Sequence, residues 1–348
     1  MPLPGLHAPT VWAHRVTWAL LAACASDAAA GQGALDPAGV QAARIHSLWQ
    51  LTVWVCIAVF TLVLLALMMA LVRATRRARR ESSEPARGER HEPGATRVVL
   101  IASLLSGAAL AGLVALDVLT DRALSRLPVN DALHIEMVGA QWWWRTRYAN
   151  DPDGPGFEVS SDLHVPVGRP VVVTLKSVDV IHSFWVPQLH GKKDMLPGRT
   201  TTIQFRADRA GSFRGECAEF CGLQHALMVF NITADPPERY AQWQALQASP
   251  ASPPAQPDAL RGQALFLARN CAQCHAVRGT PAGGTLGPDL THVASRPTIA
   301  AGTVANRPDL LAAWIVQPQS LKAGATMPPS ALEPEEVRLL VSYLETLK

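Results

Sequence analysis

A twelve-residue segment, Cys217-Ala-Glu-Phe-Cys-Gly-Leu-Gln-His-Ala-Leu-Met228, carries two thiols, an imidazole and a thioether. Thiolate, imidazole and thioether groups are the ligands that soft first-row metal ions prefer, and copper above all. Structural zinc sites draw instead on two separated Cys/His pairs, and a thioether is not a usual zinc ligand. His182, upstream of the segment, offers a second imidazole. The segment therefore predicts a copper site; the alternative is two buried cysteines beside a core methionine.

The residues on both sides of this segment, 133–235, carry the pattern of a β-rich domain. Runs rich in β-branched side chains, such as Val171–Leu175 and Thr201–Phe205, are separated by turn signals such as Pro152-Asp-Gly-Pro155 and Leu196-Pro-Gly198. Many short strands with Gly/Pro turns are typical of a sandwich or a Greek-key barrel. The metal-binding segment lies between two expected strands, so we expect it in a loop at one end of this scaffold.

A second motif, Cys271-Ala-Gln-Cys-His275, has the C-x-x-C-H spacing of covalent haem c attachment. Thioether bonds from Cys271 and Cys274 would hold the porphyrin, and His275 would reach the iron from the same side. We expect Met327 as the second axial ligand, because it is the only methionine after residue 258 and two prolines follow it. Methionine opposite histidine raises the reduction potential relative to two histidines. His292 is the competing ligand.

The composition indicates membrane content, because 49% of the 348 residues are hydrophobic and only 17% are charged. The runs Ser47–Val72 and Val98–Thr120 are long enough to span a bilayer. Residues 73–97, between them, hold eight arginines against four glutamates. The positive-inside rule therefore places this loop in the cytoplasm and both ends of the chain outside. The net charge of +3 is too small to indicate a nucleic-acid partner.

An N-terminus outside the cytoplasm requires an export signal. Residues 16–23 have the character of a signal-peptide apolar region, so we expect residues 1–23 to be a signal peptide. The sequence Leu21-Ala-Ala-Cys24 is similar to a bacterial lipobox, which would make Cys24 a lipidated residue. Cleavage at the small residues Ala28-Ala-Ala30 is the alternative.

Together these features resemble subunit 2 of the haem–copper cytochrome c oxidases, in the caa-type form with a cytochrome c fused at the C-terminal end. The resemblance covers nearly all of the chain from Leu35 to Lys348. It rests on the transmembrane hairpin, on the fused cytochrome c and on four motifs: Gln141-Trp-Trp-Trp144, Asp179-Val-Ile-His-Ser183, Met195-Leu-Pro-Gly-Arg199 and the segment from Cys217 to Met228.

The resemblance implies a cupredoxin-like fold with a binuclear copper A centre. In the family pattern Cys217 and Cys221 bridge the two coppers. The remaining ligands would be His182 and His225, one on each copper, with Met228 and the backbone carbonyl of Glu219 as weak axial ligands. The side chain of Glu219 would reach a magnesium ion shared with the catalytic subunit.

The resemblance also assigns a role to Trp142, which matches the tryptophan where electrons from cytochrome c enter. The alternative is an aromatic that packs on the sheet or at the membrane interface, and this alternative applies to all of Trp142–Trp144.

The expected fold class is a multidomain membrane protein with a two-helix transmembrane hairpin, a cupredoxin-like β-sandwich or barrel and an all-α class I cytochrome c domain. Amphipathic stretches at Leu260–Asn270 and Glu335–Leu347 are expected as helices on either side of the haem motif. The expected segments are a signal peptide (1–23), an N-terminal segment with the hairpin (24–125, helices about 47–72 and 98–120), a copper A domain (130–236), a Pro-rich linker (247–257) and a cytochrome c domain (258–348).

The function that the resemblance implies is electron transfer within a respiratory terminal oxidase of the bacterial plasma membrane. Electrons would pass from an external cytochrome c through haem c and copper A to subunit 1, which reduces oxygen to water with proton pumping; subunit 3 is a further partner. The chain offers no set of intramembrane histidines for the oxygen chemistry, so that chemistry belongs to another subunit. The alternatives are a copper A-type nitric oxide reductase and a non-enzymatic membrane-anchored electron carrier.

One departure from the family pattern concerns charge. Where many relatives carry acids just after the tryptophans, this chain has Arg145 and Arg147. The cytochrome c domain, 258–348, holds eight lysines and arginines against seven acids. Charge steering of a soluble cytochrome would therefore be weak. We expect tethering to replace it, since a short linker supplies an effective concentration on the order of millimolar.

Overall fold

The computed structural model describes residues 33–81, 93–125, 127–149 and 156–348. The predicted signal peptide (1–23), the candidate lipidation site Cys24 and the turn at Pro152–Pro155 lie outside the described residues. Residues Ala34–Lys348 form one compact unit, which contains two long helices, a β-sandwich and a small helical domain. The expected fold class is thus confirmed.

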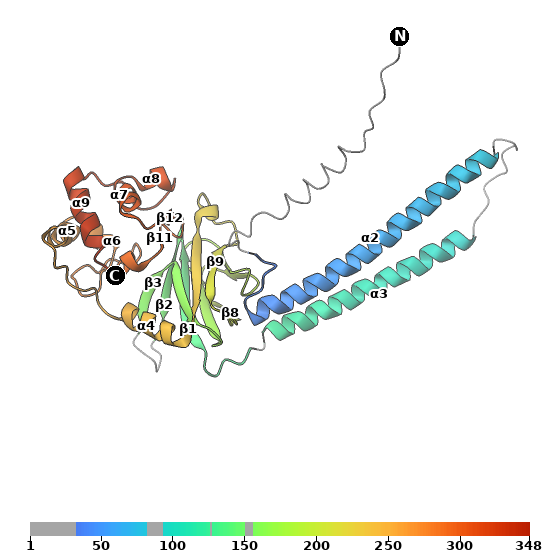
Figure 1. Cartoon of the computed structure of the whole chain (residues 1–348), viewed down its shortest axis with the longest axis horizontal. Coiled ribbons are helices and arrows are strands. Elements are labelled where there is room, and N and C mark those ends of the chain that lie inside the picture. The colour runs from blue at the N-terminus through green and yellow to red at the C-terminus, as the bar shows by residue number, and fades with distance from the viewer. Residues whose placement is uncertain (1–32, 82–92, 126, 150–155) are drawn as a thin grey trace, which may run out of the picture. The chain divides into compact units, whose positions relative to one another are not determined.

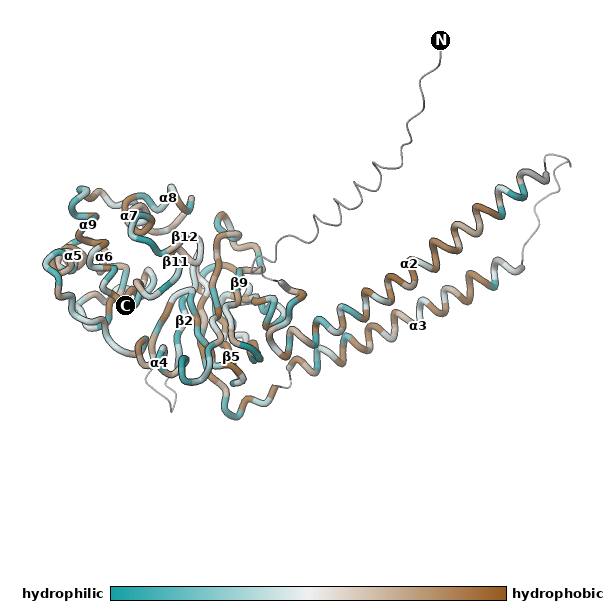
Figure 2. Tube along the Cα trace, in the orientation of Figure 1, coloured by the Kyte–Doolittle hydropathy of each residue, from teal (hydrophilic) through white to brown (hydrophobic). Residues whose placement is uncertain are grey.

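The two long helices are α2 (Val40–Glu81) and α3 (Pro93–Leu124). The beginning of α2 contacts the end of α3 (Figure 1). Both are long and apolar enough to cross a membrane. Apolar residues run along both helices (Figure 2), and their large side chains are exposed in the isolated chain. The helices extend beyond the apolar runs 47–72 and 98–120, because the flanking Ala- and Arg-rich residues are also good helix formers.

Two five-stranded sheets form the sandwich, with strand orders β3-β2-β1-β5-β8 and β4-β10-β9-β6-β7. The pairs β1/β5 and β4/β10 are parallel, and the other pairs are antiparallel. The strands are β1 (Leu133–Ala140), β2 (Trp143–Tyr148), β3 (Phe157–Ser160), β4 (Asp162–Pro166), β5 (Val171–Ser177), β6 (His182–Trp185), β7 (Lys193–Met195), β8 (Thr201–Phe205), β9 (Gly211–Cys217) and β10 (Val229–Asp235).

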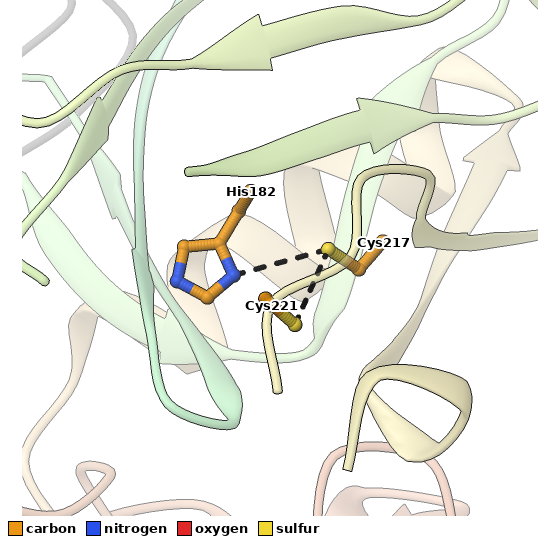
Figure 3. Close-up of side chains that lie close together, drawn as sticks. All are labelled: His182, Cys217 and Cys221. Carbon is orange, nitrogen blue, oxygen red and sulfur yellow. Dashed lines mark hydrogen bonds between the residues drawn. The ribbon is translucent and has the colours of Figure 1, made fainter. Parts of the chain in front are cut away.

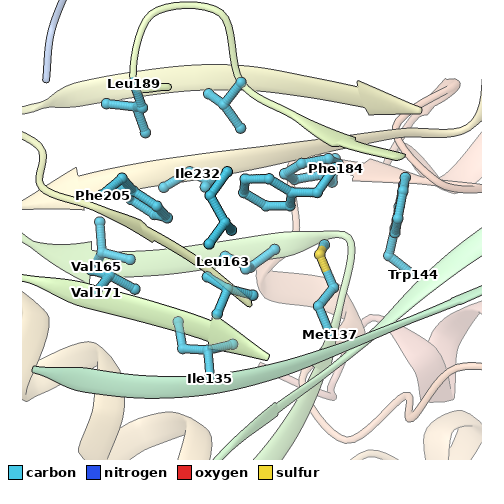
Figure 4. Close-up of a cluster of buried hydrophobic side chains, with 14 of the residues drawn as sticks. Ile135, Met137, Trp144, Leu163, Val165, Val171, Phe184, Leu189, Phe205 and Ile232 are labelled. Carbon is cyan, nitrogen blue, oxygen red and sulfur yellow. The ribbon is translucent and has the colours of Figure 1, made fainter. Parts of the chain in front are cut away.

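Alternate residues of these strands point into a core between the two sheets (Figure 4). In β5 the side chains of Val171, Val173 and Leu175 are fully buried, as the twofold periodicity of a strand requires. Phe184 and Met137 belong to this core, and Phe184 pairs with Cys217 at the start of the metal-binding segment. The runs predicted as strands at 171–175 and 201–205 are therefore confirmed.

Helix α4 (Pro237–Ala248) follows β10 and packs against β3, β4 and β10. The sequence analysis did not predict this helix, and its last two residues fall within the expected linker 247–257. Tyr240 and Gln244 are buried along one side of α4, so tertiary packing adds to its stability. The irregular part of the linker is therefore shorter than its composition suggests, since α5 begins at Pro257.

The C-terminal domain is built from α5 (Pro257–Ala268), α6 (Cys271–Cys274), α7 (Pro308–Val316), α8 (Pro318–Leu321) and α9 (Pro334–Leu344), with a short ribbon of β11 (Thr298–Ile299) and β12 (Val304–Ala305). Helices α5 and α9 cross closely at Gly262, where an added Cβ would lie 2.0 Å from the carbonyl oxygen of Leu339. Phe266 and Tyr343 form an edge-to-face pair at the same crossing. This crossing brings the two predicted helices together beside the haem motif.

The crossing gives a first test. Gly262→Ala forces α5 away from the backbone of α9, so we expect the free energy of unfolding of this domain to fall by about 3 kcal/mol, the upper end of ordinary overpacking. Denaturant unfolding of the detergent-solubilised protein, followed by haem absorbance, measures the change. Leu260→Ala, at an exposed position of the same helix, is the control and should change little. Equal stability of the two variants would contradict the close crossing.

Candidate metal centre

The metal-binding segment is a loop whose two ends are held by neighbouring strands. Cys217 is the last residue of β9, and β10 begins at Val229. The backbone N–H of Cys217 donates to the carbonyl oxygen of Met228 at 3.0 Å, and Glu216 pairs with Val229 in the antiparallel ladder. The first and last donor residues of the segment are therefore fixed beside each other, and the residues between them must fold back over the end of the sandwich.

The two thiols lie side by side, and each has its own imidazole. The Sγ atoms of Cys217 and Cys221 are 3.7 Å apart. His182 Nδ1 lies 3.8 Å from Cys217 Sγ, as Figure 3 shows, and His225 Nδ1 lies 3.7 Å from Cys221 Sγ. His182, Cys217 and Cys221 are buried and close enough to hold one metal ion.

Each thiol also has one weaker donor nearby. The carbonyl oxygen of Glu219 lies 3.2 Å from Cys217 Sγ, and Met228 Sδ lies 3.9 Å from Cys221 Sγ. The structure thus brings together all six donors expected from the sequence, in two matching sets of thiolate, imidazole and weak ligand. A set of soft donors arranged in this way fits copper.

The pKa values of the two thiols shift in opposite directions. A hydrogen bond with Cys221 lowers the pKa of Cys217 to about 3, and contacts with His182 and the backbone act in the same direction. The hydrogen bond with Cys217, together with burial, raises the pKa of Cys221. The lowered pKa of Cys217 favours its thiolate, the form in which cysteine binds a metal.

Asp179 orients His182, a role that the sequence analysis did not assign to any residue. Its Oδ1 lies 2.8 Å from His182 Nε2, and its Oδ2 accepts the backbone N–H of Gln141 at 2.7 Å. Burial alone would raise the pKa of Asp179, but the hydrogen bonds from His182, Gln141 and Val180 lower it below its usual value. The carboxylate therefore stays ionised and holds Nδ1 of His182 toward Cys217. Its position three residues before His182 was the available signal.

Gly139 leaves room for the ring of His182 on the adjacent sheet. A Cβ at this position would lie 2.8 Å from His182 Cδ2 and 3.0 Å from Cγ. Trp144 contacts the same ring edge-on, with ring centroids 6.1 Å apart. The imidazole is thus held by packing as well as by the hydrogen bond to Asp179.

The haem motif has its cysteines on the single turn of α6, with His275 directly after it. His275 Nδ1 lies 2.8 Å from the carbonyl oxygen of Pro288, so the proton is on Nδ1 and Nε2 is left as the metal-binding nitrogen. An added Cβ at Gly287 would lie 2.5 Å from His275 Cε1. The loop 287–288 therefore fixes both the tautomer and the orientation of the ring.

The two candidates for the second axial ligand differ in their surroundings. His292 is buried, with Nδ1 2.7 Å from the carbonyl oxygen of Lys348 and Nε2 3.0 Å from that of Ser249. Because both ring nitrogens face carbonyl oxygens, His292 has no nitrogen free for iron. Met327 lies half-buried in the loop between α8 and α9, and it stays the predicted ligand.

Comparison with known protein families finds a match for each of the two domains. Residues 150–234 match the model of the cytochrome c oxidase subunit II periplasmic domain, and residues 259–348 match the cytochrome c model. Cytochrome c oxidase subunit 2 of Alkalihalophilus pseudofirmus is 40% identical over 221 residues, which cover 63% of this chain and 62% of that protein. The chain belongs to the cytochrome c oxidase subunit 2 family. It is a form of this subunit with a fused cytochrome c domain.

Further relatives and a solved structure are also similar to this chain. Subunit 2 of Bacillus subtilis is 32% identical over 229 residues, covering 63% of each chain. The chain therefore spans a little over three fifths of the length of these two curated relatives. The crystal structure of the periplasmic domain of subunit II (CoxB) of Bradyrhizobium japonicum is 32% identical, covers 34% of this chain and 96% of that one, and superposes with a TM-score of 0.32. The subunit 2 domain implies copper A, and the cytochrome c domain implies haem.

Among the tryptophans of this subunit 2 domain, Trp142 borders the metal-binding loop. Its indole N–H donates to the carbonyl oxygen of Cys221 at 2.9 Å, and the side-chain amide of Gln141 donates to the same oxygen at 2.8 Å. Trp144 is fully buried against Phe230 and is a core residue. Trp143 is half-buried below the guanidinium of Arg145. The packing alternative therefore applies to Trp144, which packs against His182 from within the core, whereas Trp142 is partly exposed and is hydrogen-bonded to the candidate ligand residue Cys221.

Glu219 uses its backbone and its side chain in different directions. Its carbonyl oxygen faces Cys217, while its carboxylate is partly exposed, 3.5 Å from Lys192 Nζ.

The Asp179–His182 contact yields a second test. In Asp179→Asn the amide retains one acceptor oxygen, so either His182 or the backbone N–H of Gln141 must face an NH2 group. We expect copper affinity to fall about 10- to 100-fold. Copper retained against a chelator, counted by electron paramagnetic resonance of the oxidised protein, measures this loss. The control is Asp208→Asn, which removes an acid paired with Arg206 on the surface. Equal copper retention in both variants would exclude the orienting role.

Proposed function

We propose that this chain is the electron-accepting subunit of a respiratory haem–copper oxidase. An external donor such as cytochrome c would reduce the haem domain, which would pass electrons to the copper domain and then to a catalytic subunit that reduces oxygen to water with proton pumping. The observation that carries this proposal is the convergence of six candidate donors, among them two thiols and a thioether, at the end of a sandwich that contacts a C-x-x-C-H domain of the same chain. When bound, copper A and haem c each supply a one-electron carrier.

The contact between the two domains supports intramolecular transfer. The side-chain amide of Gln224, next to His225, donates to the carbonyl oxygen of Ala323 at 2.7 Å. Ala323 stands four residues before the candidate haem ligand Met327. The loop that holds the copper donors and the loop that holds the haem donor are therefore joined by a direct hydrogen bond.

The charges near the tryptophans also support this reading. Arg145, which stands where many relatives carry an acid, lies 3.5 Å from Glu158 and donates to the carbonyl oxygen of Thr285 in the haem domain. Burial lowers the pKa of Arg296 in the haem domain, and attraction to Asp162 and Glu158 of the copper domain opposes that shift. Both arginines interact with groups of this chain, so we do not expect them to steer a soluble cytochrome toward Trp142. The haem domain would accept electrons in its place.

The finer assignments follow from the family and stay part of the proposal. The site residues would act as the sequence analysis assigned them, and the carboxylate of Glu219 would reach a magnesium ion shared with the catalytic subunit 1. Subunit 3 would be a further partner. Helices α2 and α3 would span the bacterial plasma membrane, with the copper and haem domains on its outer side.

The proposal is tested in the assembled complex by the substitution Cys221→Ser. Loss of one bridging thiolate should abolish the copper A signal in the electron paramagnetic resonance spectrum and reduce oxygen consumption to background, while haem c is still reduced by an external donor. Cys56→Ser changes an exposed cysteine of α2, and this control should retain both the copper A signal and oxygen consumption. Full oxygen consumption in Cys221→Ser would overturn the proposal, as would a single-copper spectrum in the unsubstituted protein.

A further inference from the structure

Lys322 is a buried cation to which neither the metal centre nor the haem site assigns a role. It follows α8 and is only 3% exposed. Lysine is almost never buried to this degree without a partner that compensates its charge. Among the described residues, the polar partners of its ammonium are two carbonyl oxygens, those of Trp142 and Ala300, each at 3.1 Å. No carboxylate is paired with it in the described part of the chain.

These two carbonyls belong to different domains. Trp142 is in the copper domain, beside the metal-binding loop, whereas Ala300 is in the haem domain, in the turn between β11 and β12. Burial lowers the pKa of Lys322 to about 8. The amine therefore keeps most of its charge at neutral pH, and a charged donor forms stronger hydrogen bonds than a neutral one.

The turn that contains Ala300 also contacts the C-terminal end of the metal-binding loop. Ala300 and Ala301 have φ values of 54° and 55°, a region that residues with a side chain rarely occupy. Such a backbone persists only where its surroundings hold it. The N–H of Val229 donates to the carbonyl oxygen of Ala301 at 3.1 Å, and Thr303 Oγ1 donates to that of Leu227 at 3.1 Å. Lys322 thus links this turn to Trp142, while the turn itself is bonded to the copper domain.

Hydrogen bonds fix the backbone between Lys322 and the loop that carries Met327. The side chain of Gln319, three residues before Lys322, contacts the backbone that follows Lys322: its Oε1 accepts the N–H of Gly324, and its amide donates to the carbonyl oxygen of Ala325. Gln224 of the copper domain donates to the carbonyl oxygens of Lys322 and Ala323. Met327 follows two residues after Ala325. Fixing the ammonium of Lys322 therefore restricts the start of the loop that carries the candidate haem ligand.

We propose that Lys322 is a positioning residue that holds the haem-ligand loop against the backbone of Trp142, so that the haem domain stays docked on the metal-binding loop. The hydrogen bonds continue from Lys322 to the Trp142 carbonyl, and the indole of Trp142 in turn donates to Cys221. This inference rests on the proposed function, because it concerns the rate at which the haem domain delivers electrons to the copper domain. With Lys322 in place, delivery does not wait for the haem domain to diffuse on its linker.

The test is Lys322→Met in the assembled oxidase, with Lys348→Met as the matched control. Both substitutions remove one lysine from the haem domain, and the side chain of Lys348 is exposed. Haem c is reduced by a light pulse through an added photoreductant, and the reduction of copper A is followed by absorbance in buffers of rising viscosity. The viscosity series separates docking from folding, because a docked domain transfers at a rate independent of viscosity whereas an undocked one must first diffuse.

The unsubstituted protein and Lys348→Met should transfer at the same rate, independent of viscosity. In Lys322→Met the docked fraction falls, so we expect transfer to slow about tenfold and to slow further as viscosity rises, because the rate follows the competent fraction. The haem absorbance and the copper spectrum should be unchanged. If Lys322→Met does not assemble, Lys322→Gln replaces it, since its shorter amide cannot reach both carbonyls; the same two results are expected.

Two results would overturn the inference. One is an equal, viscosity-independent rate in the Lys322 and Lys348 variants. The other is a slower rate that does not depend on viscosity and comes with an altered haem or copper spectrum, which would make Lys322 a residue of the fold only. Absence of haem-to-copper transfer in the unsubstituted complex would instead overturn the proposed function itself.

Discussion

The pairing of β9 with β10 at the point where both leave the sandwich is the constraint on which the metal centre depends. The hydrogen bond from Cys217 to Met228 closes the segment into a loop anchored at both ends. With the ends fixed, a short irregular stretch returns Cys221 to the first thiol, Cys217, which His182 of β6 also contacts, and it places His225 beside Cys221. The donors thus come from a rigid sheet and a closed loop, which limits their movement whatever the charge of the site.

Much of this site could be predicted because its chemistry is local in sequence. Cys217 to Met228 and Cys271 to His275 carry their ligands within a few residues, and runs of β-branched residues identify strands such as Val171–Leu175. The residues that hold these ligands were not predictable in the same way. Lys322 meets Trp142 across 180 positions, and no periodicity encodes such a contact. Asp179 was visible in its motif, but only the fold shows that its carboxylate faces His182.

Charge and linker composition had pointed to a loosely tethered haem domain, and the contacts describe a more fixed arrangement. The linker residue Ala251 donates its N–H to the carbonyl oxygen of Arg278, whose guanidinium donates to the carbonyl oxygens of Gln247 and Ala248. The Pro-rich stretch therefore lies along the haem domain instead of extending freely from it. A linker held in this way adds little reach, and in the proposed transfer the interdomain contacts at Arg145, Gln224 and Lys322 take the place of effective concentration.

The closeness of Cys217 and Cys221 has a consequence for how the site is made. Sulfur atoms 3.7 Å apart need only small side-chain rotations to reach a disulfide bond length of about 2.05 Å. In an oxidising compartment, where disulfides form and persist, loading of metal competes with oxidation of the empty pair, and an oxidised pair offers no thiolate to bind a metal. In such a compartment the two thiols therefore have to stay reduced until copper binds.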